Sequence, residues 1–208
     1  MPFKYSCFIS YRNNGQSELT RRLVEGLEQA LKEELAMYYE TKIFLDRMRI
    51  ENGDIIDKQI AQALCESLCL IVLYTPAYLN HERTYCAREL CAMKQLENKR
   101  LELVGAEEKS KGLIIPIAIR DKEGMPDEFK KRAYHDFEEF DLTHPKLNKH
   151  KKYTPKIKEI AKYIFGRYNC FKNLGVDPCT NCTDFELPGA ESEEVRMLIN
   201  HSIPRFVR

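Results

Sequence analysis

The fold is decided by a continuous apolar run, Leu68-Cys69-Leu70-Ile71-Val72-Leu73-Tyr74, which the turn residues Thr75-Pro76 bring to an end. A half-buried strand alternates apolar and polar residues, and this run has no polar residue inside it. Such a strand is covered on both faces, as happens in parallel sheets that carry helices on either side. We therefore expect it to be the central, parallel strand of an α/β domain.

Strands and helices are predicted to alternate on both sides of this central run. The remaining strands are expected over residues 5–10, 42–46, 113–119 and, as a short fifth strand, 137–141. Helices are expected from residue 17, after a capping Asp54, over 83–98 and over 154–168. This alternation predicts a flavodoxin-like, doubly wound parallel sheet of about five strands with right-handed crossovers. Pro116 places the strand 113–119 nearer an edge, or at a bulge.

The chain of 208 residues suits one domain of ordinary size with an appendage. We expect a domain over residues 1–168 and a C-terminal extension over 169–208. The extension shows weak periodicity and several Pro and Gly residues.

Charge and hydropathy limit the partners that this chain is expected to bind. The formal net charge is +1, so no overall field attracts nucleic acid or an acidic membrane. No apolar run is long enough to cross a bilayer, and the start, Met1-Pro2-Phe3-Lys4, lacks the pattern of a signal peptide. We predict a cytoplasmic protein with neither a nucleic-acid nor a membrane partner.

The eight cysteines are expected to be reduced, because no export signal is recognised. Five of them lie in apolar periodic segments: Cys7, Cys65, Cys69, Cys86 and Cys91. The other three are the zinc-ligand candidates Cys170, Cys179 and Cys182, with His201 downstream. Cys179 and Cys182 form a single CxxC pair, whereas a strong zinc pattern has two closely spaced pairs. We therefore expect no metal and a reduced, loosely packed tail.

Several motifs of common enzymes are missing from the sequence. After the first strand there is only a lone Gly15 and no Gly-x-Gly-x-x-Gly, and no phosphate loop or nucleophile elbow occurs. The histidines show no metal-ligand spacing. A dehydrogenase, a P-loop ATPase and a serine hydrolase are therefore disfavoured, and no cofactor is expected.

Polar residues gather where a ligand is expected in this fold. Ser10-Tyr11-Arg12 ends the first strand, at the carboxyl edge where open α/β sheets bind ligands. Tyr85 and Glu89 are four residues apart, on one face of a predicted helix. The apolar stripe of that helix places Glu89 at the edge of its buried face. We expect a pocket with a ring, a carboxylate and a guanidinium; the alternative is that Glu89 is an ordinary solvated glutamate.

These segments resemble a TIR domain (Toll/interleukin-1 receptor type) over about residues 4–168. The resemblance is carried by four segments in order: Phe8-Ile9-Ser10-Tyr11-Arg12, then Ile43-Phe44-Leu45-Asp46 with the loop 47–53, then Tyr74-Thr75-Pro76-Ala77-Tyr78-Leu79, and finally Tyr85-Cys86-Ala87-Arg88-Glu89-Leu90. It implies a TIR fold, and it matches Glu89 to the glutamate with which the enzymatic members cleave NAD⁺. In bacterial members the usual setting is antiphage defence, a form of innate immunity.

The activity implied by the resemblance is an NAD⁺ glycohydrolase or an ADP-ribosyl cyclase, with NAD⁺ as the substrate and no separate cofactor. Glu89 is the predicted catalytic residue. The predicted substrate-binding residues are Ser10, Tyr11, Arg12, Asp46 and Tyr85. One carboxylate suffices because nicotinamide leaves NAD⁺ as a neutral base and needs no acid, unlike the leaving group of an ordinary glycoside. The carboxylate then stabilises positive charge growing on the ribose.

The resemblance also implies self-association, through the loop 47–53 that looks like the family's BB loop. Head-to-tail contacts of this kind build filaments, and they complete the site between neighbours. The alternative function is a non-enzymatic TIR adaptor that acts by assembly alone. A phosphoacceptor receiver domain shares the sheet topology but needs an acidic cluster after the first strand, where this chain has Ser10-Tyr11-Arg12. The product, whether ADP-ribose, a cyclic isomer or a conjugate, is left open.

Overall fold

The computed structural model describes residues 3–12, 18–45, 56–82, 84–140, 150–174, 178 and 181–202, with only the backbone at 201 and 202. Its centre is a five-stranded sheet in the order β2-β1-β3-β4-β5, and every neighbouring pair is parallel. The strands are β1 (Tyr5–Tyr11), β2 (Ile43–Leu45), β3 (Ser67–Tyr74), β4 (Ile114–Ala118) and β5 (His135–Asp136). The predicted doubly wound α/β sheet is confirmed.

The predicted central strand, β3, lies in the middle of the sheet, and all of its residues are buried. It pairs with β1, where Cys7 lies beside Cys69, and with β4, where Ile115 lies beside Ile71. Helices exclude water from both of its faces, which is why its sequence needs no polar positions.

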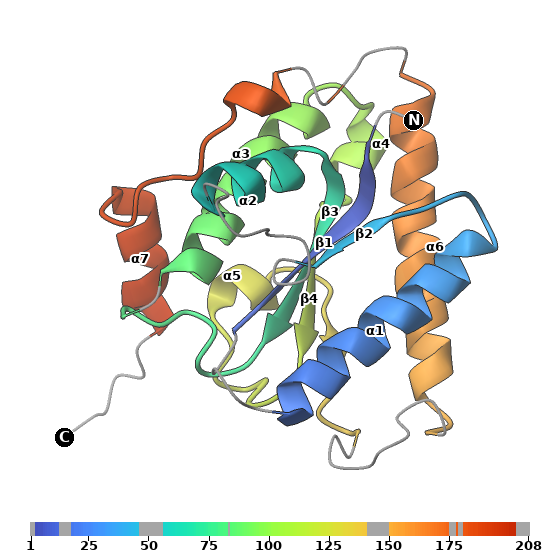
Figure 1. Cartoon of the computed structure of the whole chain (residues 1–208), viewed down its shortest axis with the longest axis horizontal. Helices are drawn as coiled ribbons and strands as arrows, with labels where there is room; N and C mark the ends of the chain where they lie inside the picture. The colour runs from blue at the N-terminus through green and yellow to red at the C-terminus, as the bar shows by residue number, and fades with distance from the viewer. Residues whose placement is uncertain are drawn as a thin grey trace.

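Two pairs of helices cover the two faces of the sheet (Figure 1). On one face, α1 (Glu18–Ala36) packs against α6 (Tyr153–Lys172). On the other face, α2 (Ile56–Cys65) packs against α3 (Tyr85–Leu101). The leucines of α1 that are spaced by four, Leu23, Leu27, Leu31 and Leu35, are all buried. This spacing forms the apolar stripe that binds an amphipathic helix to a sheet.

The far edge of the sheet differs from the prediction, because the strand expected at 137–141 is wrong. The fifth strand is His135–Asp136, and the chain turns away after the Phe137 N–H donates to the Ala118 carbonyl at 2.9 Å. Pro116 fits this edge. Alternate residues of a parallel strand bond to the same neighbour, and Leu113 and Ile119 bond to β3. The missing N–H of Pro116 therefore faces the β5 side, where β5 begins only opposite Ile117.

The C-terminal part of the chain packs against the domain. Helix α6 continues to Lys172, and it is followed by a 3₁₀ turn (Cys182–Asp184) and by α7 (Glu193–Ser202), which lies against α3 (Figure 1). Val195 of α7 is fully buried. A disulfide joins Cys182 to Cys65, the last residue of α2. The prediction that these two cysteines are reduced is therefore wrong, and so is the zinc candidacy of Cys182.

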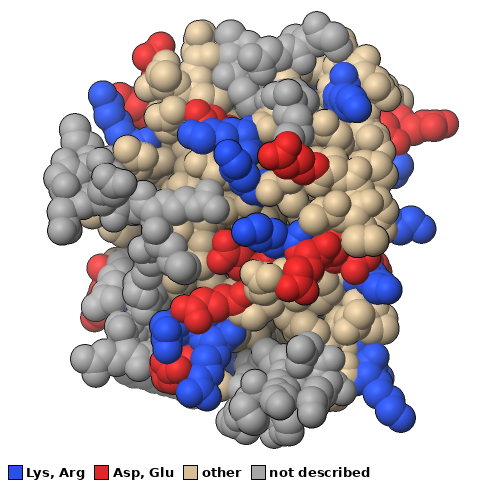
Figure 2. All heavy atoms as spheres, turned by 45° about the vertical axis from the view of Figure 1, so that its right-hand side comes forward, with Lys and Arg blue, Asp and Glu red and all other residues tan. Residues whose placement is uncertain are grey.

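Opposite charges are interspersed on the surface. Figure 2 shows one face on which basic and acidic side chains lie next to one another. On α1, for example, Glu18 pairs with both Arg21 and Arg22. Two short helices, α4 (Ala106–Lys109) and α5 (Asp127–Lys130), complete the described elements. None of the helices in the described part of the chain has both the length and the apolar composition that crossing a membrane requires.

Candidate functional site

The candidate site lies at the carboxyl end of the sheet, where three segments converge. Ser10 is the penultimate residue of β1, Tyr78 lies in the connection that leaves β3, and Glu89 is in the second turn of α3. Residues 75–78 form a turn directly after β3, in which the Tyr78 N–H donates to the Thr75 carbonyl at 2.9 Å. Ligands of open parallel sheets bind at this edge.

A hydrogen-bonded chain connects the three side chains. The Ser10 hydroxyl donates to Oε2 of Glu89 at 2.5 Å, and Ser10 Oγ lies 2.7 Å from the Tyr78 hydroxyl. All three residues are buried, and Glu89 is only 3% exposed. Glu89 is therefore not a solvated helix glutamate, as the alternative held. Burial raises the pKa of Tyr78 well above its ordinary value, so its phenol stays protonated and able to donate.

Tyr11 lies on the opposite face of the sheet from Ser10, because successive side chains of a strand alternate. Arg12, just beyond the end of β1, lines the same cavity as Tyr11. With Arg120 and Thr75 they line this cavity of about 120 Å³ against the first turns of α1. Ser10 instead faces α3, where it meets Glu89. The structure thus separates Tyr11 and Arg12 from the pair formed by Ser10 and Glu89.

Tyr85 takes part in a cluster at the surface end of α3. Its side chain is 43% exposed, and its ring lies 5.2 Å from the guanidinium of Arg88. Arg88 donates to Asp57 of α2 at 2.6 Å and to the Pro188 carbonyl at 2.7 Å. The hydrogen bond from Arg88 lowers the pKa of the Asp57 carboxyl. The C-terminal extension therefore touches the residue that immediately precedes Glu89.

Some predicted positions lie outside the described residues. These are Asp46, the loop 47–53, the predicted helix cap Asp54, Cys179 and the side chain of His201, and their roles remain predictions. Cys170 is a partly buried free thiol. Within the described ranges, no group of three or more His, Cys, Asp or Glu side chains is arranged to hold a metal ion.

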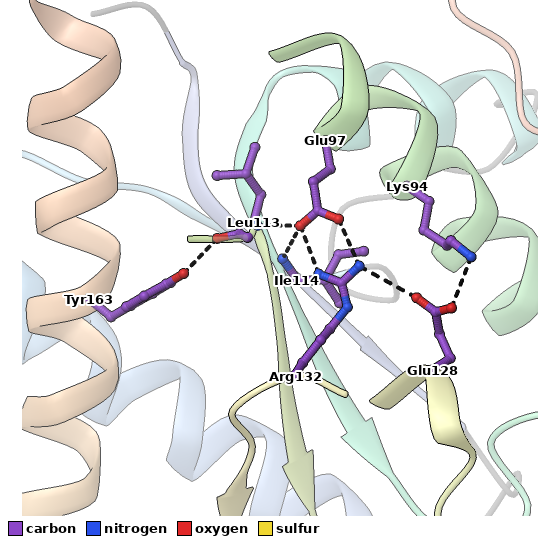
Figure 3. Close-up of polar contacts among 8 residues, drawn as sticks. Lys94, Glu97, Leu113, Ile114, Glu128, Arg132 and Tyr163 are labelled. Carbon is purple, nitrogen blue, oxygen red and sulfur yellow. Dashed lines mark hydrogen bonds and ion pairs between the residues drawn. The ribbon is translucent and has the colours of Figure 1, made fainter. Parts of the chain in front are cut away.

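A second buried carboxylate of α3, Glu97, has a structural role (Figure 3). Arg132 binds both of its oxygens, at 2.8 and 2.7 Å. Oε1 also accepts the N–H of Leu113 at 2.5 Å and that of Ile114 at 3.3 Å, just where β4 begins. Arg132 and Lys94 both bind Glu128 as well, at 3.4 and 3.0 Å. The guanidinium of Arg132 and two backbone N–H groups together satisfy this buried acid. Glu97 therefore fixes α3 to the start of β4.

Sequence reasoning missed Tyr78, Arg88 and the pair Glu97–Arg132. The available signal for Tyr78 was its place directly after the turn that ends the central strand, at the ligand-binding edge. Glu97 and Glu89 are eight residues apart on one helix, so they share a face. That spacing marked Glu97 as buried too, but it did not show that Arg132 binds it.

The arrangement around Glu89 suits the stabilisation of positive charge. A buried carboxylate fixed by hydroxyl groups needs no reorganisation when a cation develops beside it, and low surrounding polarity strengthens the attraction. The Ser10 hydroxyl, itself in contact with the hydroxyl of Tyr78, orients the carboxylate.

Comparisons with known proteins identify relatives of this chain. A sequence model of the family described as "TIR domain" matches residues 7–148. The chain is 29% identical over 121 residues to the "Probable 2' cyclic ADP-D-ribose synthase BdTIR" of Brachypodium distachyon. This match covers 58% of this chain and 49% of that protein. It thus spans about half the length of this relative. The TIR domains of the activated Roq1 resistosome that recognises the effector XopQ align with a TM-score of 0.40 and 20% identity, over 86% of this chain and 95% of that one.

Proposed function

We propose, from the fact that this chain belongs to the TIR domain family, that it cleaves NAD⁺ at the bond between nicotinamide and ribose. The observation that carries the proposal is Glu89, a carboxylate 3% exposed at the carboxyl edge of the sheet and bound by Ser10. The name of the Brachypodium relative supports it, since the ADP-ribose unit is what remains of NAD⁺ once nicotinamide leaves.

In the proposed reaction the C1′–N bond of the nicotinamide riboside breaks. The bonding electron pair goes to the pyridinium nitrogen, so nicotinamide departs neutral without a general acid. Positive charge develops on the ribose, where the Glu89 carboxylate stabilises it. Attack by water at C1′ then gives ADP-ribose and a proton. Attack by a hydroxyl group of the same molecule gives a cyclic product, and attack by another acceptor gives a conjugate.

The substrate is proposed to contact Ser10, Tyr11, Arg12 and Tyr85, and also Asp46. Arg12 suits a phosphate group, since a guanidinium binds phosphate oxygens in pairs. The cavity of about 120 Å³ that it lines with Arg120 is too small to hold a dinucleotide. NAD⁺ must therefore extend beyond this cavity, and the exposed Tyr85 ring offers a surface for stacking at the end of α3.

Self-association through the loop 47–53 is part of the proposal, as is a role in antiphage defence. The test of self-association is the rate per molecule at rising protein concentration. A rate per molecule that increases steeply supports assembly, and a constant value contradicts it.

The decisive experiment on activity is incubation of concentrated protein with NAD⁺, followed by identification of the products by mass. We expect nicotinamide and an ADP-ribose product. Glu89→Gln keeps the side-chain volume and removes the charge, so the rate should fall a hundredfold or more, on the order of 3 kcal/mol or more in the barrier. Glu102→Gln, the same change at an exposed position just beyond α3, is the matched control. Equal rates in the two variants would refute the role of Glu89, and absence of NAD⁺ cleavage by the wild-type chain would assign the protein to the adaptor alternative.

A further inference from the structure

The hydrogen bonds around Glu89 have a definite direction. An ionised carboxylate has no proton and can only accept, so the proton between Ser10 and Glu89 comes from the serine hydroxyl. A serine hydroxyl has only that one proton to give. The contact of 2.7 Å between Tyr78 and Ser10 must then be donated by the tyrosine. The order of donation is therefore Tyr78 to Ser10 to Glu89.

Tyr78, the first donor in this series of hydrogen bonds, is held rigidly by the core. Tyr78 is fully buried, and its ring packs edge-on against Phe129 with the centroids 5.9 Å apart. Its backbone N–H is fixed by the turn after β3. A tyrosine confined in this way has one hydroxyl position, and it sets where the Ser10 hydroxyl can point.

The middle member is held by the sheet. Ser10 lies in β1 with its backbone in register with Val72 of β3, and it is 1% exposed. Its carboxylate partner comes from α3, which Arg88 anchors to α2 through Asp57. The three groups thus stand on separate elements whose relative positions the core fixes.

From this geometry we propose that Tyr78 is a positioning residue for Glu89, acting through the hydroxyl of Ser10. It holds Ser10 in the orientation that donates to the carboxylate, and so fixes one orientation of the carboxylate in the site. This inference rests on the proposed NAD⁺ cleavage only for its consequence in the reaction. The hydrogen-bonded order itself is a property of the protein without substrate.

The kinetic test is a double-mutant cycle with Tyr78→Phe and Ser10→Ala. Tyr78→Phe keeps the ring and removes one hydroxyl, and we expect kcat to fall about tenfold with little change in KM, as for one lost hydrogen bond. In the Ser10→Ala background the same change should lower kcat less than about twofold, because the link to Glu89 is already broken. Equal losses in both backgrounds would overturn the relay, by which we mean the action of Tyr78 on Glu89 through the Ser10 hydroxyl.

Tyr163→Phe is the matched control for Tyr78→Phe. It also removes one hydroxyl from a tyrosine ring, here a half-buried one. The Tyr163 hydroxyl donates to the carbonyl of Gly112 at 2.7 Å, the same distance as between Tyr78 and Ser10 (Figure 3). Tyr163 lies on α6, away from the Glu89 chain. It should lower thermal stability as Tyr78→Phe does, and leave kcat unchanged. A kcat loss in both variants would assign the effect to stability and overturn the inference.

A measurement without substrate separates this inference from the proposed function. The Glu89 carboxyl carbon is titrated by NMR in the wild-type chain, in Tyr78→Phe and in Tyr163→Phe, with the signal assigned by its loss in Glu89→Gln. Donors to a carboxylate favour its charged form, so the pKa of Glu89 should rise in Tyr78→Phe and stay in place in Tyr163→Phe. An unmoved pKa in Tyr78→Phe refutes the relay even where NAD⁺ is cleaved. If NAD⁺ is not cleaved at all, the proposed function fails, and the titration still decides the relay.

Discussion

Removal of the Cys65–Cys182 bridge is predicted to destabilise the protein strongly, because the bridge closes a long loop. The two cysteines are 117 residues apart in sequence. In the chain-entropy account, a bridge over a loop of about 100 residues stabilises the folded state by about 4.7 kcal/mol, and natural bridges contribute about 2–5 kcal/mol. The double variant Cys65→Ser/Cys182→Ser should therefore lose several kcal/mol of unfolding free energy. Both positions are buried, so the two hydroxyls add to the loss.

Urea unfolding followed by circular dichroism, with and without a thiol reductant, measures this effect. The reductant should destabilise the wild-type chain and leave the double variant unchanged. For the wild-type chain, the slope of unfolding free energy against urea concentration should also be steeper with reductant than without it, because the unfolded chain without the bridge exposes more surface. Cys91→Ser is the control: it buries a serine at a free cysteine that is 3% exposed, and it should keep the full response to reductant.

Two results would refute this reasoning. One is a wild-type unfolding curve that does not respond to reductant. The other is a peptide map, prepared after blocking free thiols in denaturant, in which the peptides of Cys65 and Cys182 are each modified and not linked. Either would restore the prediction, made from the sequence, that these cysteines are reduced.

Two further predictions concern the edge of the sheet. Arg132→Met leaves the buried Glu97 carboxylate without its guanidinium and should lower the unfolding free energy by about 3–5 kcal/mol. Lys131→Met, at the exposed neighbouring position, should change the unfolding free energy little. Equal effects of the two variants in urea unfolding would contradict the role of the Arg132–Glu97 pair. Burial lowers the pKa of His135 below its ordinary 6.5 despite the nearby Glu159. Its contribution to stability should therefore be complete above pH 6.5 and decline as the pH falls through the folded-state pKa, and His135→Gln should flatten this decline in thermal unfolding measured from pH 7 to 5.

The parts of the fold that the sequence predicts are those set by local pattern. The run 68–74 is central because a strand buried on both faces can have no polar residue inside it, and the leucine spacing of α1 defines its buried stripe. The burial of Glu89 was also accessible, since its neighbours Cys86 and Leu90 show which side of α3 faces the core. These are properties of residues within a few turns of one another.

The parts that the sequence did not predict depend on contacts between distant segments. Tyr78 meets Ser10 across 68 residues, Arg132 meets Glu97 across 35, and Cys182 meets Cys65 across 117. No periodicity in either segment specifies such a partner. The fifth strand was misplaced for a related reason: Phe137 and Phe140 are apolar because they pack on each other in a turn, with ring centroids 4.9 Å apart, and not because they lie in the sheet.

Helix α3 carries two buried acids, one hydrogen-bonded to Ser10 and the other paired with Arg132. Glu89 and Glu97 are eight residues apart, about 12 Å along the axis. The guanidinium of Arg132 neutralises Glu97, so a second cation brought near it would gain little, and the pair instead fixes the helix against β4. Glu89 accepts a hydrogen bond from the Ser10 hydroxyl, which in turn lies against the hydroxyl of Tyr78. A helix anchored at Glu97 can thus hold the Glu89 carboxylate at the ligand edge, where a developing cation would be attracted to it.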